Sequence, residues 1–345
     1  MRAFLDRLGV QLPIIQAPMA GGPDTPELAA AVGEAGGLGS LGCAYLSAEQ
    51  IDALVARTRS LAGKPFALNL FIREDDATAP ADPAPILAMF RQELGLPSQG
   101  RPGKPPPSFD AQLAAVLRAR PRVFSFTFGL LKPSQLDELR AANILVVGTA
   151  TSLDEAEALA ALGVDAIAAQ GSEAGGHRGT FIGRTEESLI GTMALTRQIV
   201  AKVNIPVIAA GGIMDGAGIR AAFGLGATAV QLGTAFMLCP EAGTHPAHRA
   251  HLLSPEARRT VVTRAFSGRA ARGIRNRMTD AFEGVSTPPF PVQQELTAEL
   301  RAAAAAQGRT DLMQMWTGQG APLLRELPAA VLVRALAAEA GLPIT

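Results

Sequence analysis

The stretch IPVIAAGGIMDGAGIRAAFGLGATAVQLGT, residues 205–234, decides the fold. Two short runs, residues 206–210 and 229–232, flank a segment of helical composition that extends from Gly216 to Phe223. The runs are apolar at nearly every position rather than at alternate ones, which is typical of strands buried on both faces of a parallel sheet covered by helices. The stretch therefore predicts a strand, a helix and a second strand parallel to the first.

The same alternation extends back to the N-terminus. It predicts strands at residues 12–18, 38–42, 65–71, 123–128, 144–148, 166–170, 206–210 and 229–232. It predicts helices at residues 25–34, 47–61, 110–120, 133–142, 152–162, 191–203 and 216–223. Eight such units indicate an α/β fold, a (β/α)8 TIM barrel, which typically needs about 250 residues. A doubly wound open sheet is the alternative and fits eight units less neatly.

Two regions fall outside this alternation. Residues 73–108 are rich in proline and follow the third strand, so we expect an insertion that rises as a lid from the carboxyl end of the barrel. Residues 239–345 are alanine-rich, with a proline-rich break at residues 287–291, and we expect a smaller helical C-terminal cap over the same mouth. The predicted domains are therefore a barrel over residues 1–238 and a cap over residues 239–345.

Composition narrows the class of protein. Of the 345 residues, 48% are hydrophobic and 18% charged, which excludes a disordered chain. Lys and Arg total 31, as do Asp and Glu, so the zero net charge argues against nucleic-acid or membrane partners. The only cysteines, Cys43 and Cys239, form no zinc or redox spacing, and no secretory or membrane-spanning segment is evident. We expect a cytoplasmic protein, monomer or homodimer, acting on a small molecule.

In barrels of this kind the functional site is built from the loops after the strands. Ala17, Pro18 and Met19 precede a double glycine after the first strand, which suits either a flat ligand or a tight turn. Asn69 sits in a buried apolar strand, where it faces a ligand or is a satisfied core amide. His177 follows Gly175 and Gly176 beyond the sixth strand, a position that favours a catalytic or ligand-contacting role over a structural one.

The residues that follow the last two predicted strands indicate a phosphate-binding site. Gly211 and Gly212 follow the seventh strand, and Gly233 and Thr234 follow the eighth. In many barrels, backbone N–H groups and a helix N-terminus at these two loops bind phosphate. A phosphate-bearing cofactor or substrate is therefore predicted, and FMN fits the wide mouth of a barrel.

Other motifs favour less specific interpretations. Residues 37–42 match GxGxxG but follow a helix and contain a strand, which argues against a dinucleotide fingerprint. His245, His248 and His251 lack the further ligands that a metal site needs. The arginines between Arg264 and Arg277 form a solvated or packing face, or meet an anionic substrate or the cofactor. Gln319 lies near the site or in simple cap packing.

Several motifs together resemble the nitronate monooxygenase family, also called 2-nitropropane dioxygenases, which are FMN-dependent (β/α)8 barrels. The most specific motif is GSEAGGHRG, residues 171–179, and the resemblance extends over nearly the whole chain. QAPMAG at residues 16–21, AGGI at 210–213, QLGT at 231–234, FSGR at 266–269 and WTGQ at 316–319 support it. Thr127 departs from the family pattern, because many relatives carry histidine there, and the pocket tyrosines and lysine of some members have no evident counterparts.

The resemblance implies oxidation of an alkyl nitronate, for example propionate 3-nitronate, by O2 to a carbonyl compound and nitrite through a flavin semiquinone. It implies that His177 is the catalytic residue, which hydrogen-bonds the nitro group and acts as base toward a neutral nitroalkane. The residues expected at FMN are Ala17, Pro18, Met19, Asn69, Gln170, Gly175, Gly176, Gly211, Gly212, Gln231, Gly233 and Thr234. An FMN-dependent NAD(P)H reductase of quinones or enoyl thioesters, and a phosphate-ligand-binding barrel without turnover, are the alternatives.

Overall fold

A computed structural model describes residues 1–72, 85–97 and 106–343 and contains an eight-stranded parallel sheet. The strand order is β1-β9-β8-β6-β5-β4-β3-β2, and an isolated parallel bridge between Ile15 and Leu38 joins the two edges. The strands are β1 (Ile14–Gln16), β2 (Gly39–Gly42), β3 (Phe66–Phe71), β4 (Val123–Thr127), β5 (Leu145–Ala150), β6 (Ala166–Gln170), β8 (Val207–Ala210) and β9 (Ala229–Leu232). The predicted (β/α)8 barrel is confirmed.

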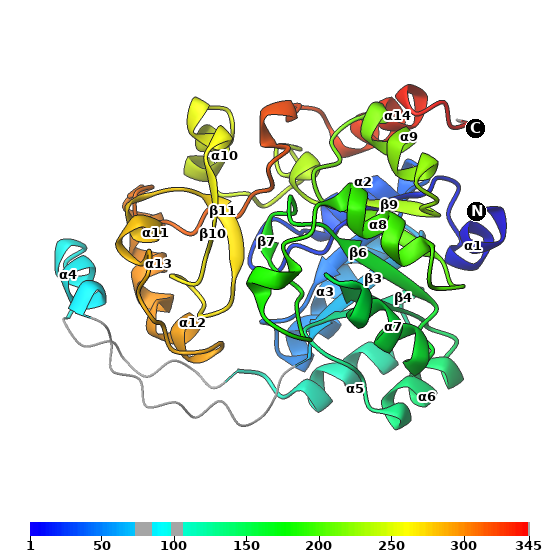
Figure 1. Cartoon of the computed structure of the whole chain (residues 1–345), viewed down its shortest axis with the longest axis horizontal. Coiled ribbons are helices and arrows are strands. Elements are labelled where there is room, and N and C mark those ends of the chain that lie inside the picture. The colour runs from blue at the N-terminus through cyan, green and yellow to red at the C-terminus, as the bar shows by residue number, and fades with distance from the viewer. Residues whose placement is uncertain (73–84, 98–105, 344–345) are drawn as a thin grey trace.

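The helices between these strands form a layer around the sheet (Figure 1). They are α2 (Pro26–Glu34), α3 (Ala48–Leu61), α5 (Phe109–Ala119), α6 (Pro133–Ala141), α7 (Leu153–Leu162), α8 (Thr192–Val200) and α9 (Gly216–Gly224). Local sequence sets where they begin: the side chain of Thr25 accepts a hydrogen bond from Leu28 N at 2.9 Å, with Pro26 in the first turn. Ser47 and Gln50 form a capping box at the start of α3.

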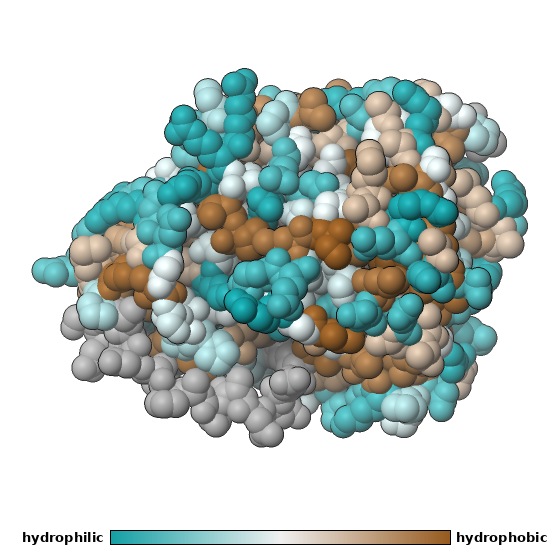
Figure 2. Space-filling model, viewed as in Figure 1, coloured by the Kyte–Doolittle hydropathy of each residue, from teal (hydrophilic) through white to brown (hydrophobic). Residues whose placement is uncertain are grey.

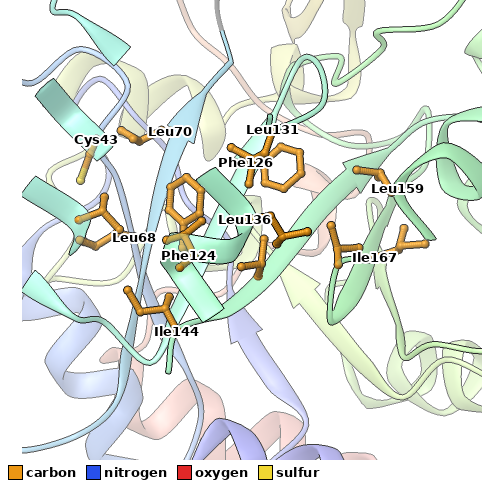
Figure 3. Close-up of a cluster of buried hydrophobic side chains, with 14 of the residues drawn as sticks. Cys43, Leu68, Leu70, Phe124, Phe126, Leu131, Leu136, Ile144, Leu159 and Ile167 are labelled. Atoms are coloured by element: carbon orange, nitrogen blue, oxygen red, sulfur yellow. The ribbon is translucent and has the colours of Figure 1, made fainter. Parts of the chain in front are cut away.

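Apolar side chains fill the space between the sheet and these helices. Figure 3 shows Leu68 and Leu70 of β3 beside Phe124 and Phe126 of β4, and all four side chains are fully buried. The rings of Phe124 and Phe126 are nearly parallel, with centroids 6.3 Å apart. These strands are covered by helices on one side and by the barrel interior on the other, which explains why their sequences are apolar at nearly every position.

The GxGxxG match belongs to this packing. Its glycines enter strand β2, and a Cβ at Gly39 would lie 2.2 Å from the backbone oxygen of Ala29 on α2. Glycine is therefore required for close contact between strand and helix, and the interpretation against a dinucleotide fingerprint agrees with this geometry.

A short helix that the periodicity did not predict lies below the sheet. Helix α1 (Arg2–Leu8) buries Phe4, Leu5 and Leu8 among side chains from inside the barrel, including Ile15 and Val123. Seven residues are too few for a clear helical period, so this element is recognisable only from its contacts.

Composition suggested that the chain after residue 239 is helical, but the structure also contains short strands there. Strands β10 (Thr260–Thr263) and β11 (Ala271–Ile274) pair antiparallel, and β11 also pairs with β7 (Gly176–His177). Each of these strands is two to four residues long, too short for a recognisable alternation.

The remaining elements of the described chain are η1 (Thr185–Ser188), η2 (Thr234–Phe236), α10 (Pro246–Leu252), η3 (Pro255–Arg258), α11 (Arg277–Ala281), α12 (Val292–Leu296), α13 (Ala298–Ala306), η4 (Ala321–Leu323) and α14 (Ala329–Glu339).

In Figure 1 the yellow and orange elements form a group beside the barrel, whereas α14 returns to it next to α9. Part of the expected lid, residues 73–84 and 98–105, lies outside the described residues. Helix α4 (Pro85–Glu93), between these two segments, is anchored to the orange group by an ion pair of Arg91 with Glu299 at 2.6 Å. The lid and the domain boundaries remain predictions.

Hydrophilic and hydrophobic side chains are interspersed over the face seen in Figure 2. No helix in the described part of the chain is both long and apolar enough to cross a membrane.

Candidate active site

A cavity of about 280 Å³ opens at the carboxyl ends of the barrel strands. Every residue that the sequence placed at the site lines it. These are Ala17, Pro18, Met19, Asn69, Gln170, Gly175, Gly176, His177, Gly211, Gly212, Gln231, Gly233 and Thr234. The cavity is also lined by residues that the sequence did not point to, among them Thr244, Met313 and Gln314. These come from loops outside the strand–helix pattern, so no local signal placed them there.

Backbone N–H groups without acceptors gather at the ends of β8 and β9. The N–H groups of Gly211, Gly212, Gly233 and Thr234 donate to no acceptor within the described ranges. Gly211 (φ 117°) and Gly212 (φ 71°) adopt a conformation that favours glycine, which turns the chain at the cavity wall. Gly211, Gly233 and Thr234 are half-buried and Gly212 is exposed, so this cluster of N–H groups can bind an anionic ligand such as a phosphate.

The loop that carries His177 is fixed by polar side chains beneath it. Nε2 of Gln170 donates to the carbonyl of His177 at 3.0 Å, and its Oε1 accepts from Gly179 N at 2.8 Å. Arg178 is buried and donates to the carbonyls of Gly171, at 2.6 Å, and Ser188, at 3.1 Å. The amide of Gln170 therefore holds the histidine loop while the residue also lines the cavity.

A cap segment closes directly over the same loop. A Cβ at Gly175 would lie 2.5 Å from the backbone nitrogen of Gly318, and Gly318 N in turn donates to the hydroxyl of Thr234 at 2.9 Å. Gly175 is thus a point of close backbone approach between the barrel and the cap. The neighbouring Gln319, in contrast, is exposed, and only its backbone N–H contacts the loop, at Glu173 O.

The imidazole of His177 has one hydrogen-bond partner among the described residues. Its Nε2 lies 2.8 Å from Ser267 Oγ, and Ser267 Oγ also lies 3.1 Å from the carbonyl oxygen of Arg269. Nδ1 of His177 has no partner among the described residues and remains available to the cavity that the side chain lines. Burial lowers the pKa of His177 to about 3, and the positive charges of Arg269 and Arg301 add to the effect. The imidazole is therefore neutral at pH 7.

Aromatic rings surround His177. The centroids of Phe71 and Phe128 each lie 5.9 Å from that of His177, Phe290 lies at 6.1 Å and Trp316 at 5.7 Å. Thr127 lines the cavity near Thr149, with the two hydroxyls 3.5 Å apart. The environment of the imidazole is thus mostly apolar, which explains the direction of its pKa shift.

The arginines between residues 264 and 277 divide into two kinds. Arg275 and Arg277 form exposed ion pairs with Asp280 and Glu93, and the buried Arg272 donates to the carbonyl of Ser172 at 2.8 Å. These serve packing and solvation. The guanidinium of Arg269 lies 3.7 Å from the ring centroid of Phe128 and is the member whose charge acts on His177. No group of metal-binding side chains is found in the described ranges, the three histidines of residues 245–251 included.

Asp24 supports the cavity loop that follows β1 and was not predicted from the sequence. This half-buried carboxylate accepts hydrogen bonds from the backbone N–H groups of Met19 and Gly42, and from Nε2 of Gln16 at 2.9 Å. It therefore shapes the loop that carries Met19 into the cavity. Burial raises the pKa of Asp24 to about 7, against the opposing effect of its three donors. No local pattern identifies this residue, because its contact with Gly42 at the end of β2 exists only in the folded chain.

We expect Asp24→Asn to lower the free energy of unfolding by about 1–3 kcal/mol, because the new amide sets a donor against the donor of Gln16. The wild-type pKa is raised above the unfolded value, so the contribution of Asp24 is present at low pH and is lost as pH rises through 7. The difference between the two proteins is therefore largest below about pH 4 and decreases as pH rises from there to about 7. Urea unfolding at several pH values measures it.

Asp215→Asn is the matched control. Asp215 caps α9 by accepting from Gly218 N at 2.9 Å, and asparagine caps helices equally well. Equal losses of stability in the two variants would contradict a specific role for Asp24.

Comparisons with known proteins agree with this geometry. The family model described as nitronate monooxygenase matches residues 3–339. The chain is 45% identical to a nitronate monooxygenase of Pseudomonas aeruginosa over 97% of this chain and 98% of that protein. It is 44% identical to a nitronate monooxygenase of Paraburkholderia phytofirmans over 98% and 94% of the two chains. Among solved structures, a nitroalkane oxidase from Streptomyces ansochromogenes aligns with a TM-score of 0.91 at 40% identity, covering 98% of both chains. FabK from Thermotoga maritima aligns with a TM-score of 0.77 at 29% identity, covering 98% of this chain and 96% of that one.

Proposed function

This chain belongs to the nitronate monooxygenase family of oxidoreductases, and we propose that it oxidises alkyl nitronates to carbonyl compounds and nitrite, using FMN held in the barrel cavity. The observation that carries the proposal is the joint presence in one cavity of unpartnered N–H groups, suited to a phosphate, and of a neutral histidine with a free ring nitrogen. The substrate is a small molecule with O2 as co-substrate.

The residues of the cavity fit FMN. The unpartnered N–H groups of Gly211, Gly212, Gly233 and Thr234 suit its phosphate, as expected of the last two loops of a barrel. Ala17, Pro18, Met19, Asn69, Gln170, Gly175, Gly176 and Gln231 would hold the rest of the cofactor. When bound, FMN supplies the electron acceptor for the nitronate and passes electrons to O2.

The hydroxyl of Ser267 controls which ring nitrogen of His177 carries the proton. Ser267 has one proton and two acceptors within reach, Nε2 of His177 at 2.8 Å and the carbonyl of Arg269 at 3.1 Å. When Ser267 donates to Nε2, Nδ1 carries a proton and donates to an anionic nitro group. When Ser267 donates to Arg269, Nδ1 is unprotonated and accepts the α-proton of a neutral nitroalkane. One side chain thus serves both forms of the substrate.

The low pKa of His177 favours the anionic nitronate over the neutral nitroalkane as substrate. A ring whose pKa is lowered to about 3 remains neutral, so it donates to an anion readily but accepts a proton weakly. Preformed nitronates are therefore the better substrates. The aromatic rings of Phe71, Phe128 and Phe290 surround the imidazole and make its environment apolar.

An absorbance experiment on the purified protein tests the proposal. We expect a flavin spectrum that is bleached without oxygen by an alkyl nitronate and not by NADH, and nitrite release when oxygen is present. Rapid bleaching by NADH alone would instead favour an FMN-dependent NAD(P)H reductase, in line with the similarity to FabK. A colourless protein that takes up no FMN would favour a phosphate-ligand-binding barrel.

A further inference from the structure

A second cavity, of about 530 Å³, lies at the amino ends of the barrel strands, opposite the candidate active site. The segments that lead into β3, β4 and β5 meet there: Arg122 N donates to the carbonyl of Phe66 at 3.1 Å, and Leu145 N to that of Arg122 at 3.1 Å. Arg122 also lies beside the end of α1, since a Cβ at Gly9 would be 3.8 Å from its Nε. In Figure 1, α1 lies at the end of the barrel away from β7. The cavity is large enough for a small ligand.

Among the described residues, the charged side chains that line this cavity are all basic. They are Arg59, Lys64, Arg120 and Arg122. None of the four forms an ion pair with a carboxylate of residues 1–72, 85–97 or 106–343. Arginines on the same helices but outside the cavity do: Arg57, on α3, pairs with Glu27 at 2.8 Å. Arg118, on α5, pairs with Asp52 at 2.7 Å. Four positive charges therefore share one concave surface in a protein whose net charge is zero.

The carboxyl ends of three helices face the same cavity and offset these charges only in part. Helices α3, α5 and α6 end at its rim, and each helix end is equivalent to about −0.5 of a charge. Nη2 of Arg59 donates to the carbonyl of Ala119 at the end of α5, so one of these ends is already covered. The four side chains and the three helix ends together leave an excess of about two positive charges. A small polyanion would neutralise that excess.

The backbone of Arg120 favours a role for its side chain beyond helix termination. Arg120 follows α5 with φ of 44°, in the left-handed region that residues with a Cβ adopt at a cost. Glycine occupies the corresponding position after α1, at Gly9, and after α7, at Gly163. A glycine after α5 would avoid this cost, and strain of this kind is common where a side chain serves a function.

We propose that this cavity is a second ligand-binding site, which takes a di- or triphosphate group, either free or carried by a nucleoside. Guanidinium groups match phosphate oxygens in pairs, and an ammonium such as that of Lys64 adds a further charge. The concave shape suits a small anion that several side chains contact at once. The assignment does not depend on the proposed function, because no described residue lines both cavities.

Calorimetric titration of the purified protein with inorganic triphosphate tests the assignment. We expect saturable binding in the wild type and an affinity about 10-fold lower in Arg120→Gly, because a charged hydrogen-bond donor is lost. The same change relieves the left-handed backbone, so the melting temperature is expected to rise by about 1–3 °C. A residue with a purely structural role would not combine lower affinity with higher stability. Arg118→Met is the matched control on the same helix, and its affinity is expected to stay within about twofold of the wild type.

Two substitutions of Gly63 separate charge from shape. Gly63 lines the cavity, and a Cβ there would meet no atom within 4 Å, so a longer side chain fits without moving its neighbours. Gly63→Glu places a carboxylate among the four cations and is expected to weaken triphosphate binding at least about 10-fold. Gly63→Gln has the same size without the charge and is expected to keep most of the affinity.

Two further ligands identify the form of the anion. Equal affinity for adenosine triphosphate and inorganic triphosphate would show that the phosphate chain alone is recognised, and higher affinity for the nucleotide would show that the nucleoside contributes. Either result supports the assignment. Inorganic phosphate is expected to bind at least about 10-fold more weakly than triphosphate, because it reaches fewer of the four cations. The absence of saturable triphosphate binding at millimolar concentrations would overturn the proposal, as would unchanged affinity in both Arg120→Gly and Gly63→Glu.

Discussion

Gly233→Val is expected to yield a folded protein that contains no bound flavin. Gly233 follows β9, lines the cavity, and has φ of −104°, a value that residues with side chains adopt without strain. A Cβ built there would meet Ala17 Cβ at 3.5 Å and Met19 Sδ at 3.7 Å, which are ordinary contact distances. The valine methyl groups would therefore occupy cavity space without displacing backbone.

The expected loss follows from the role of the last two strand ends. A side chain beside the N–H groups of Gly233 and Thr234 prevents a phosphate from reaching them. Losing several such hydrogen bonds weakens binding by on the order of 10³-fold or more, because each bond to a charged group contributes about 1.5–3 kcal/mol. The ratio of flavin absorbance to protein absorbance measures occupancy, and circular dichroism measures folding.

Gly63→Val is the control for adding the same side chain elsewhere. Gly63 lies in the loop between α3 and β3, and a Cβ there would meet no atom within 4 Å. This variant is expected to keep its flavin. If Gly233→Val bound flavin as tightly as the wild type, the phosphate would have to lie elsewhere.

The barrel was predictable because its signals are local. Strands such as residues 166–170 and 229–232 are apolar at nearly every position because helices cover the sheet, and that pattern is visible in the chain itself. The glycines at residues 211 and 212 were predictable for the same reason, since strand ends of a barrel share one face.

Other parts of the site depend on contacts between distant segments. Ser267 meets His177 only because β11 pairs with β7, and Gln314 reaches the cavity from beyond α13. Such contacts are defined by three-dimensional surroundings and leave no trace in spacing or periodicity.

His177→Phe is expected to lower kcat/KM for a preformed nitronate by about 10²–10³-fold, the usual effect of losing a donor aimed at a reacting anion. Phenylalanine resembles the aromatic residues around it, Phe71, Phe128 and Phe290, so the fold is expected to tolerate it. Turnover of a neutral nitroalkane is expected to disappear, because no base remains. Steady-state oxygen consumption with each substrate form measures both effects.

His177→Asn separates the two roles of the imidazole. Its amide N–H can still donate to a nitro group, but it has no basic nitrogen. We expect partial activity on nitronates and none on neutral nitroalkanes, and full activity of this variant on both forms would contradict any role for His177. Because the histidine pKa lies near 3, far below its ordinary value, the ring is neutral above about pH 4. The wild-type kcat/KM for a preformed nitronate is therefore expected to show no histidine titration between about pH 5 and 8. A change in kcat/KM with an apparent pKa of about 6.5, the ordinary value of histidine, would show that the imidazole is not desolvated by the surrounding rings.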